Sequence, residues 1–306
     1  MNSLTKVTIS PHIHIGNSTA GIMRDVLIAL LPATIAGAVI FGVRALLPVL
    51  ICIISCVGFE ALFNLIAKKE QTVGDLSAAV TGLLLALNLP ANIPLWQCVV
   101  GSLFAIVIVK CLFGGIGNNV VNPAITARVF MLVAFESLAK PAFPIADAVS
   151  SATPLEAETM PSLLTLFLGN HGGAIGETCA VALLLGGIYL IIRRVISWHL
   201  PVVFIGTVFV FSYFMEGFDA LSALALIMTG GLFIGAIFMA TDYVTSPNTA
   251  WGKVIFGIGA GLLTCLMRYF SNYPEGVSFA ILFMNILTPF IDKWTRHKVF
   301  ATGGKR

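Results

Sequence analysis

Charged residues are scarce in this sequence. They make up 10% of the 306 residues, against 58% that are hydrophobic, and the mean hydropathy is +0.98. A soluble domain carries about 25% charged residues. Most of the chain must therefore face lipid or other helices, which excludes an ordinary soluble protein. The net charge of +3 is small, and the basic residues gather at the ends of hydrophobic runs, so nothing indicates a nucleic-acid partner.

Cysteine pairs with metal-binding spacing are absent as well. No two cysteines have C-x-x-C spacing, and no histidine lies close to one. Free cysteine within an apolar run behaves as a small hydrophobic residue. The pattern therefore predicts no metal and no iron–sulfur cluster held by this chain alone. The six cysteines are Cys52, Cys56, Cys98, Cys111, Cys179 and Cys265.

Hydrophobic runs are what the sequence has in abundance. A full membrane span needs about 20 residues, and the runs at 76–89 and 122–136 are short for that. Glycine, asparagine and proline flank both, and interrupted spans of this kind are how membrane proteins build internal sites. The pattern predicts an all-α membrane protein of about ten transmembrane helices, some short or broken. The runs are 24–42, 46–66, 76–89, 95–113, 122–136, 177–193, 199–215, 219–239, 252–268 and 277–292.

Lysine and arginine predict the orientation of these spans. Ten spans with both termini in the cytoplasm place most basic residues on or near the cytoplasmic side. Residues 1–23 lack the features of a secretory signal and read as a cytoplasmic segment, and 293–306 form a basic cytoplasmic tail. The polar interval 137–176 is then extracytoplasmic.

A weak internal repeat divides the chain in two. Thr81-Gly-Leu-Leu-Leu is similar to Thr229-Gly-Gly-Leu-Phe, and a proline and a tryptophan follow at matching places. This pattern predicts two five-helix halves, 24–136 and 177–292, joined by the loop 137–176. Because five is odd, the halves would cross the membrane in opposite directions, and their interface is the natural place for a ligand.

The loop 137–176 carries the most specific motif, with the spacing D-x-x-S-x-A-T. Asp147, Ser150, Ala152 and Thr153 occupy its defined positions, and Ser151 fills the variable position between Ser150 and Ala152. Proline follows the threonine, and a residue before proline is pushed out of the helical region into an extended one. The Thr153 hydroxyl is therefore expected to project from open backbone, where a modifying enzyme could reach it.

The motif resembles the flavin attachment motif of the RnfD family, the D subunits of the Rnf ferredoxin:NAD oxidoreductase complex. The resemblance extends over nearly the whole chain. It includes Ser10-Pro-His12, Asp75–Pro90, Phe113–Ala124, Ala240–Pro247 and Pro274–Asn285. The B subunit of the sodium-pumping NADH:quinone reductase is related, but it has a longer N-terminal region, so the short one here favours the Rnf branch.

The resemblance implies a cofactor and partners. FMN would be linked through its phosphate to Thr153 by a separate flavin transferase, and electrons would pass to or from a covalent flavin on the G subunit. The A, C and E subunits would complete the complex in the cytoplasmic (inner) membrane of a prokaryote. A non-covalent riboflavin is expected within the helices. Electron flow between ferredoxin and NAD would drive sodium ions or protons across the bilayer, and this chain alone would have no complete activity.

Several polar residues within or beside the spans are further candidates. Arg128 lies within a span, where a charge is costly and is usually functional or paired; a flavin, Glu136 or Glu60 would be its partner. Asn88, Asn119 and Asn122 could contact a flavin ring or satisfy broken backbone.

Asp242 lies at the end of a span that is expected to be broken. There its carboxylate could bind a cation or cap a helix.

Two other functions fit parts of the pattern. The B subunit of the sodium-pumping reductase shares the motif, and a small-solute channel or transporter would also have inverted halves and broken spans. A transporter has no use for D-x-x-S-x-A-T on an external loop. Thr153 therefore separates an electron-transfer subunit from a channel or transporter.

Overall fold

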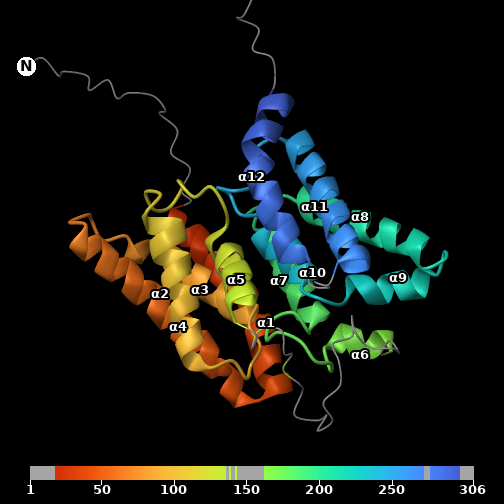
Figure 1. The fold of residues 1–306 in the computed structure, drawn as a ribbon, viewed down its shortest axis with the longest axis horizontal. Coiled ribbons are helices and arrows are strands. Elements are labelled where there is room, and N and C mark those ends of the chain that lie inside the picture. The colour runs from red at the N-terminus through yellow and green to blue at the C-terminus, as the bar shows by residue number, and fades with distance from the viewer. Residues whose placement is uncertain (1–17, 136–137, 139–141, 143–161, 272–275, 297–306) are drawn as a thin grey trace, which may run out of the picture.

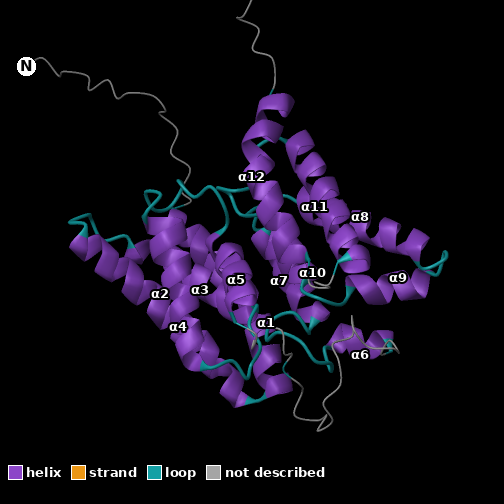
Figure 2. Cartoon of the chain, in the orientation of Figure 1, coloured by secondary structure: helices purple, strands orange, loops and turns teal. Residues whose placement is uncertain are grey.

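The fold is known from a computed structural model that describes residues 18–135, 138, 142, 162–271 and 276–296. Helix is the dominant structure throughout these ranges, and their only β-type pairing is an isolated bridge between Ala142 and Gly173 (Figure 2). The all-α prediction is therefore confirmed. The motif from Asp147 to Thr153 lies outside the described residues.

Five helices make up the first half of the chain (red to yellow in Figure 1). The fourth continues as a π-helix, Phe104–Cys111, and the fifth begins at Pro123, where the Asn122 side chain accepts hydrogen bonds from the first turn. They are α1 (Thr19–Phe41), α2 (Leu46–Ile66), α3 (Ser77–Leu87), α4 (Leu95–Leu103) and α5 (Pro123–Ala134).

The second half (green to blue in Figure 1) follows a short connecting helix, α6 (Leu163–Leu168). A second π-helix, Gly235–Met239, follows directly after α10. The remaining helices are α7 (Ala180–Ile192), α8 (His199–Met215), α9 (Ala220–Ile227), α10 (Leu232–Ile234), α11 (Ala250–Phe270) and α12 (Val277–Thr295).

All ten apolar runs are helical in the structure. Four helices are long and apolar enough to cross a membrane: Thr19–Phe41, Val43–Ile66, Ala250–Phe270 and Val277–Thr295. Five are shorter apolar helices, among them α3 and α5, which were expected to be short. The tenth run is a bent pair, Ala220–Ile227 and Leu232–Met239, with an angle of 65° between its parts. The protein is thus a multi-pass membrane protein with broken and shortened spans.

The bend between α9 and α10 has a local cause. Gly230 and Gly231 both have positive φ, 67° and 60°, which favours glycine and ends a right-handed helix. The guanidinium of Arg268 in α11 donates to Leu226 O at 2.7 Å and to Thr229 O at 2.8 Å. It therefore satisfies carbonyls at the end of α9 that have no partner within the helix.

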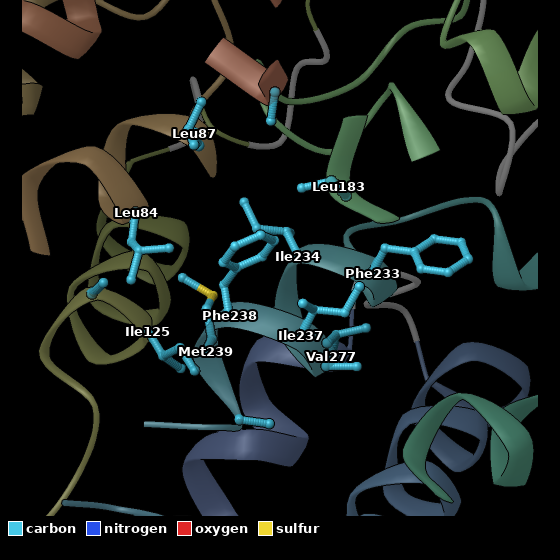
Figure 3. Close-up of a cluster of buried hydrophobic side chains, with 14 of the residues drawn as sticks. Leu84, Leu87, Ile125, Leu183, Phe233, Ile234, Ile237, Phe238, Met239 and Val277 are labelled. Carbon is cyan, nitrogen blue, oxygen red and sulfur yellow. The ribbon is translucent and has the colours of Figure 1, made fainter. Parts of the chain in front are cut away.

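The halves meet mainly through two helix pairs, α1 with α7 and α5 with α12. Helices that hold equivalent places in the two halves thus meet one another, as a twofold relation between the halves would require. Between them, Phe238 and Met239 of the second half face Leu84 and Ile125 of the first (Figure 3). The expected boundaries of the halves and their inverted orientation stay predictions.

Small residues allow α1 and α7 to approach closely. Ala29 and Ala33 of α1 are 2% exposed, and a Cβ at Gly186 of α7 would lie 2.1 Å from the Ala29 carbonyl oxygen. In a bilayer, helix association depends on such close packing, because lipid is as apolar as the side chains.

Gly186→Ala is therefore expected to destabilise the contact between the halves by about 1–3 kcal/mol, the usual cost of overpacking. Thermal unfolding of the purified protein in detergent measures the effect. Gly206→Ala in α8 is the matched control, because a Cβ there meets nothing within 4 Å, so its stability should be unchanged or slightly raised. Equal stability of the two variants would contradict the close contact.

Candidate functional site

A cavity of about 390 Å³ lies between the two halves. Its walls come from the first turns of α1, from α3, from the loop before α5, from the end of α7 and from the segment after the second π-helix. Most of the lining is apolar, including Val26, Leu84 and Phe238. Such a cavity, apolar with a few polar groups and lined by several helices, has the character of a small-molecule site.

Asn119 lines this cavity and carries a buried polar atom without a partner among the described residues. This atom is the side-chain Oδ1. A buried acceptor without a donor costs roughly 1–3 kcal/mol, so such an atom calls for a ligand donor or a bound water. Asn119 is therefore the lining residue that points most directly to a ligand.

Asn122 also lines the cavity, but its amide is already in use. Oδ1 accepts from Ala124 N at 3.0 Å and Ile125 N at 3.3 Å, and Nδ2 donates to Met239 O at 3.2 Å. It thus caps α5 and ties α5 to the second π-helix. This arrangement favours a structural role for Asn122, and a direct contact with a ligand stays a prediction.

Lys110 is a cationic residue of the cavity wall. It is 1% exposed; its ammonium donates to Glu60 Oε1 at 2.8 Å and to Ser77 Oγ at 2.6 Å. Glu60, 2% exposed, also accepts from Thr72 Oγ1 at 2.8 Å. A buried ion pair joined to further hydrogen bonds therefore lies against the cavity.

Glu60 was one of the two carboxylates expected to pair with Arg128, and the structure pairs it with Lys110 instead. The other, Glu136, lies outside the described residues. Lys110 was expected among the charges on or near the cytoplasmic side. The position of Lys110 inside the apolar run 95–113 is the feature of the sequence that indicates its burial.

Arg128 and Asn88 contact one another, and neither lines the cavity. Arg128 Nη1 donates to Asn88 Oδ1 at 2.5 Å, and Nη2 lies 4.0 Å from Glu177 Oε2. All three residues are buried. Asn88 Nδ2 also donates to Leu84 O at 2.7 Å and so binds the last turn of α3. Glu177, the acidic partner, was not anticipated from the sequence.

Asp242 is half-buried in the cavity wall. Its Oδ2 accepts from Thr245 Oγ1 at 3.0 Å, while Thr249 is the residue that caps α11. Burial raises the pKa of the Asp242 carboxyl above its usual range, and hydrogen bonds, chiefly that from Thr245, act in the opposite direction. No group of three or more His, Cys, Asp or Glu side chains within the described ranges could hold a metal ion. A cation at Asp242 stays a prediction.

Broken and shortened spans around a cavity place the chain among multi-pass membrane proteins. Comparison with known proteins gives the family. A model of the NQR2, RnfD, RnfE family matches residues 6–301. The chain belongs to this family.

Three similar proteins are named as D subunits of ion-translocating complexes. The D subunit of the Na⁺-translocating ferredoxin:NAD⁺ oxidoreductase complex of Acetobacterium woodii is 47% identical, over 98% of this chain and 97% of that protein. The D subunit of the proton-translocating ferredoxin:NAD⁺ oxidoreductase complex of Clostridium ljungdahlii is 40% identical, over 97% and 96%. The D subunit of the ion-translocating oxidoreductase complex of Stutzerimonas stutzeri is 36% identical, over 95% and 94%.

Proposed function

We propose that this chain is the D subunit of an ion-translocating ferredoxin:NAD oxidoreductase and works there as a membrane electron-transfer subunit. The observation that carries the proposal is the similarity to D subunits, which covers nearly the full length of both partners in each comparison. The chain is one relay of the complex, whose other members include the A, C, E and G subunits, and has no complete activity alone.

The first cofactor proposed is FMN, attached through its phosphate to the Thr153 hydroxyl by a flavin transferase. The motif with Asp147, Ser150, Ser151 and Ala152 supports this assignment. A flavin, when bound, supplies one- and two-electron transfer, while the protein positions it and tunes its electronics. The charge bias of the spans, which puts 137–176 outside the cytoplasm, supports attachment on that side.

The second cofactor proposed is a non-covalent riboflavin in the cavity of about 390 Å³. The residues present fit this group in two respects. The apolar walls suit a flat aromatic ring, and the unpartnered Oδ1 of Asn119 can accept a hydrogen bond from a ring N–H. The cavity lies at the N-terminal end of α1 and the C-terminal end of α7, which the orientation proposed here places on the cytoplasmic side.

Lys110 gives the cavity its electrostatic character. Its ammonium charge is shared with Glu60 but remains in a low-dielectric setting, where charges act more strongly than in water. A positive group at the wall stabilises negative charge that appears in the cavity on reduction. Lys110 therefore favours the reduced form of an electron carrier bound there, while the carboxylate of Asp242 in the same wall acts in the opposite direction.

Filling the cavity tests the second cofactor. Val26→Trp in α1 is expected to lower the amount of extractable, non-covalent flavin per chain by at least about tenfold, because the indole occupies the volume the ring needs. Flavin released by acid precipitation and measured by fluorescence gives the stoichiometry. Val39→Trp on the same helix is the control, since Val39 is 75% exposed. Equal flavin content in both variants would contradict a ligand in this cavity.

Overall sequence similarity does not determine which ion is translocated during electron transfer. The relatives at 47% and 40% identity are named for sodium ions and for protons respectively. The B subunit of a sodium-pumping NADH:quinone reductase stays the nearest alternative, because the matching family includes NQR2. A small-solute transporter is the alternative from another class.

One experiment separates these functions. The complex that copurifies with the tagged chain is reconstituted in vesicles and supplied with reduced ferredoxin and NAD⁺, or with NADH and a quinone. Ferredoxin-dependent NAD⁺ reduction supports the proposal. Quinone reduction without ferredoxin activity indicates the reductase, and the absence of any flavin-dependent activity indicates a transporter.

A further inference from the structure

A second cavity, of about 340 Å³, lies where the first turns of α1 meet the end of α7. Its lining is mainly polar, in contrast to the first cavity, and includes Ser18, Arg24, Asp25, Arg193, Arg194 and Tyr243. Tyr243 also lines the first cavity, so the two lie on either side of one wall.

Positive charge dominates this cavity. Its three arginines, Arg24, Arg193 and Arg194, lie around a single carboxylate, that of Asp25. This carboxylate already accepts hydrogen bonds from neighbouring side chains. Asp25 Oδ2 accepts from Arg193 Nη2 at 3.1 Å and from Arg193 Nε at 3.3 Å, and its Oδ1 accepts from Tyr189 OH at 3.1 Å.

Arg24 and Arg194 are exposed. No ion pair or hydrogen bond joins either guanidinium to another described residue. Among the described residues, two positive charges therefore remain without an ion-pair partner here, and an anion is the ligand that suits them.

Apolar surface leads away from the arginines along both helices. On α1, Arg24, Ile28 and Leu31 follow one another at four- and three-residue spacing, so they share one helix face. Ile28 is 43% exposed and Leu31 51%. On α7, Ile188 and Ile192 are 53% and 74% exposed and lie four residues apart, next to Arg193. A ligand that contacts both the arginines and these apolar faces has an anionic group at one end and hydrocarbon chains at the other.

We propose that this cavity binds the phosphate-bearing headgroup of an anionic phospholipid, whose acyl chains lie along the exposed faces of α1 and α7. Basic pockets between transmembrane helices near the cytoplasmic leaflet suit such headgroups, and anionic lipid is concentrated there. The arginines give bidentate contacts to phosphate. The bound lipid would thus stiffen the α1–α7 contact beside the first cavity. The proposal does not depend on the electron-transfer function.

Native mass spectrometry of the complex, stripped of lipid in detergent and titrated with phosphatidylglycerol, tests this site. The Arg24→Gln/Arg194→Gln double variant is expected to bind the lipid about thirtyfold more weakly than the wild type, and each single variant about fivefold. Each basic residue contributes about 1 kcal/mol towards an anionic membrane lipid, and 1.4 kcal/mol is a factor of ten. Arg193 is left in place because it holds Asp25.

The control variant is Lys68→Gln/Lys69→Gln, which removes two exposed charges after the end of α2, on the same proposed side of the membrane but outside the lining of this cavity. It should bind phosphatidylglycerol as the wild type does, and phosphatidylcholine should bind neither protein measurably. Three results would each overturn the proposal: equal loss in the lysine control, equal binding of phosphatidylcholine, or full competition by inorganic phosphate at the same concentration. The single arginine variants decide the question if the double variant fails to fold.

Discussion

Replacing Thr153 with valine is expected to remove the covalently bound flavin completely. Valine has nearly the shape of threonine but no hydroxyl, so no phosphoester can form at this position. The measurement is flavin fluorescence of the chain on a denaturing gel, where only covalent flavin survives. The wild-type band should fluoresce at the mass of this chain, 32.5 kDa, and the band of the variant should be dark.

Thr159→Val is the matched control for this experiment. Thr159 lies six residues further along the same polar interval but outside the D-x-x-S-x-A-T spacing. It should leave the fluorescence unchanged. Fluorescence that persists in Thr153→Val would contradict the assignment. So would a dark wild-type band from cells that contain the transferase.

Lys110→Met is expected to destabilise the protein by about 3–5 kcal/mol. That is the usual cost of removing one partner from a buried ion pair. Lys110 Nζ lies 2.8 Å from Glu60 Oε1, and both side chains are 2% exposed. Without the ammonium, Glu60 must either stay charged in an apolar setting or take up a proton. Thermal unfolding in detergent measures the effect, and Lys293→Met in the exposed surface of α12 is the control.

The double variant Lys110→Met/Glu60→Gln separates the ion pair from simple packing. It removes the stranded charge, so most of the lost stability should return, and the sum of the single effects should exceed the double effect by about 1–3 kcal/mol. Strictly additive effects would show that the pair does not act as a unit. A Lys110→Met variant as stable as the Lys293→Met control would mean that the charge is not buried in the protein.

Hydropathy alone was sufficient to locate the spans. Each of the ten apolar runs contains a helix, and the two shortest runs became two of the shortened helices, α3 and α5. These features depend on residues close together in the chain, because span length and helix termination are local properties. The span 219–239 was expected to be broken at its end, beside Asp242, but the structure bends it at Gly230 and Gly231. Hydropathy could not locate this bend, because glycine does not interrupt a hydropathy run even though both residues here have positive φ.

Pairings between distant spans could not be predicted. Glu60 and Lys110 are 50 residues apart, and Arg128 and Glu177 are 49 apart, so no sequence periodicity connects them. For the same reason the partner of Arg128 was left open among a flavin, Glu136 and Glu60. Among the asparagines, the sequence correctly indicated a group near the short spans. It could not show that Asn119 lines a cavity with a free oxygen, while Asn88 binds Arg128.

The buried ion pairs have a consequence for how the chain enters the membrane. Each span is inserted in order as it leaves the ribosome, and a charge at the centre of a helix costs about 2.5–3.5 kcal/mol on insertion. α2 therefore carries Glu60 into the bilayer before Lys110 exists to neutralise it. The segment Val43–Ile66, with a mean hydropathy of 2.4, is the most apolar of the four long helices, and its leucines and isoleucines offset that charge. A less apolar α2 would not enter the bilayer until the segment after α4, which carries Lys110, had been synthesised.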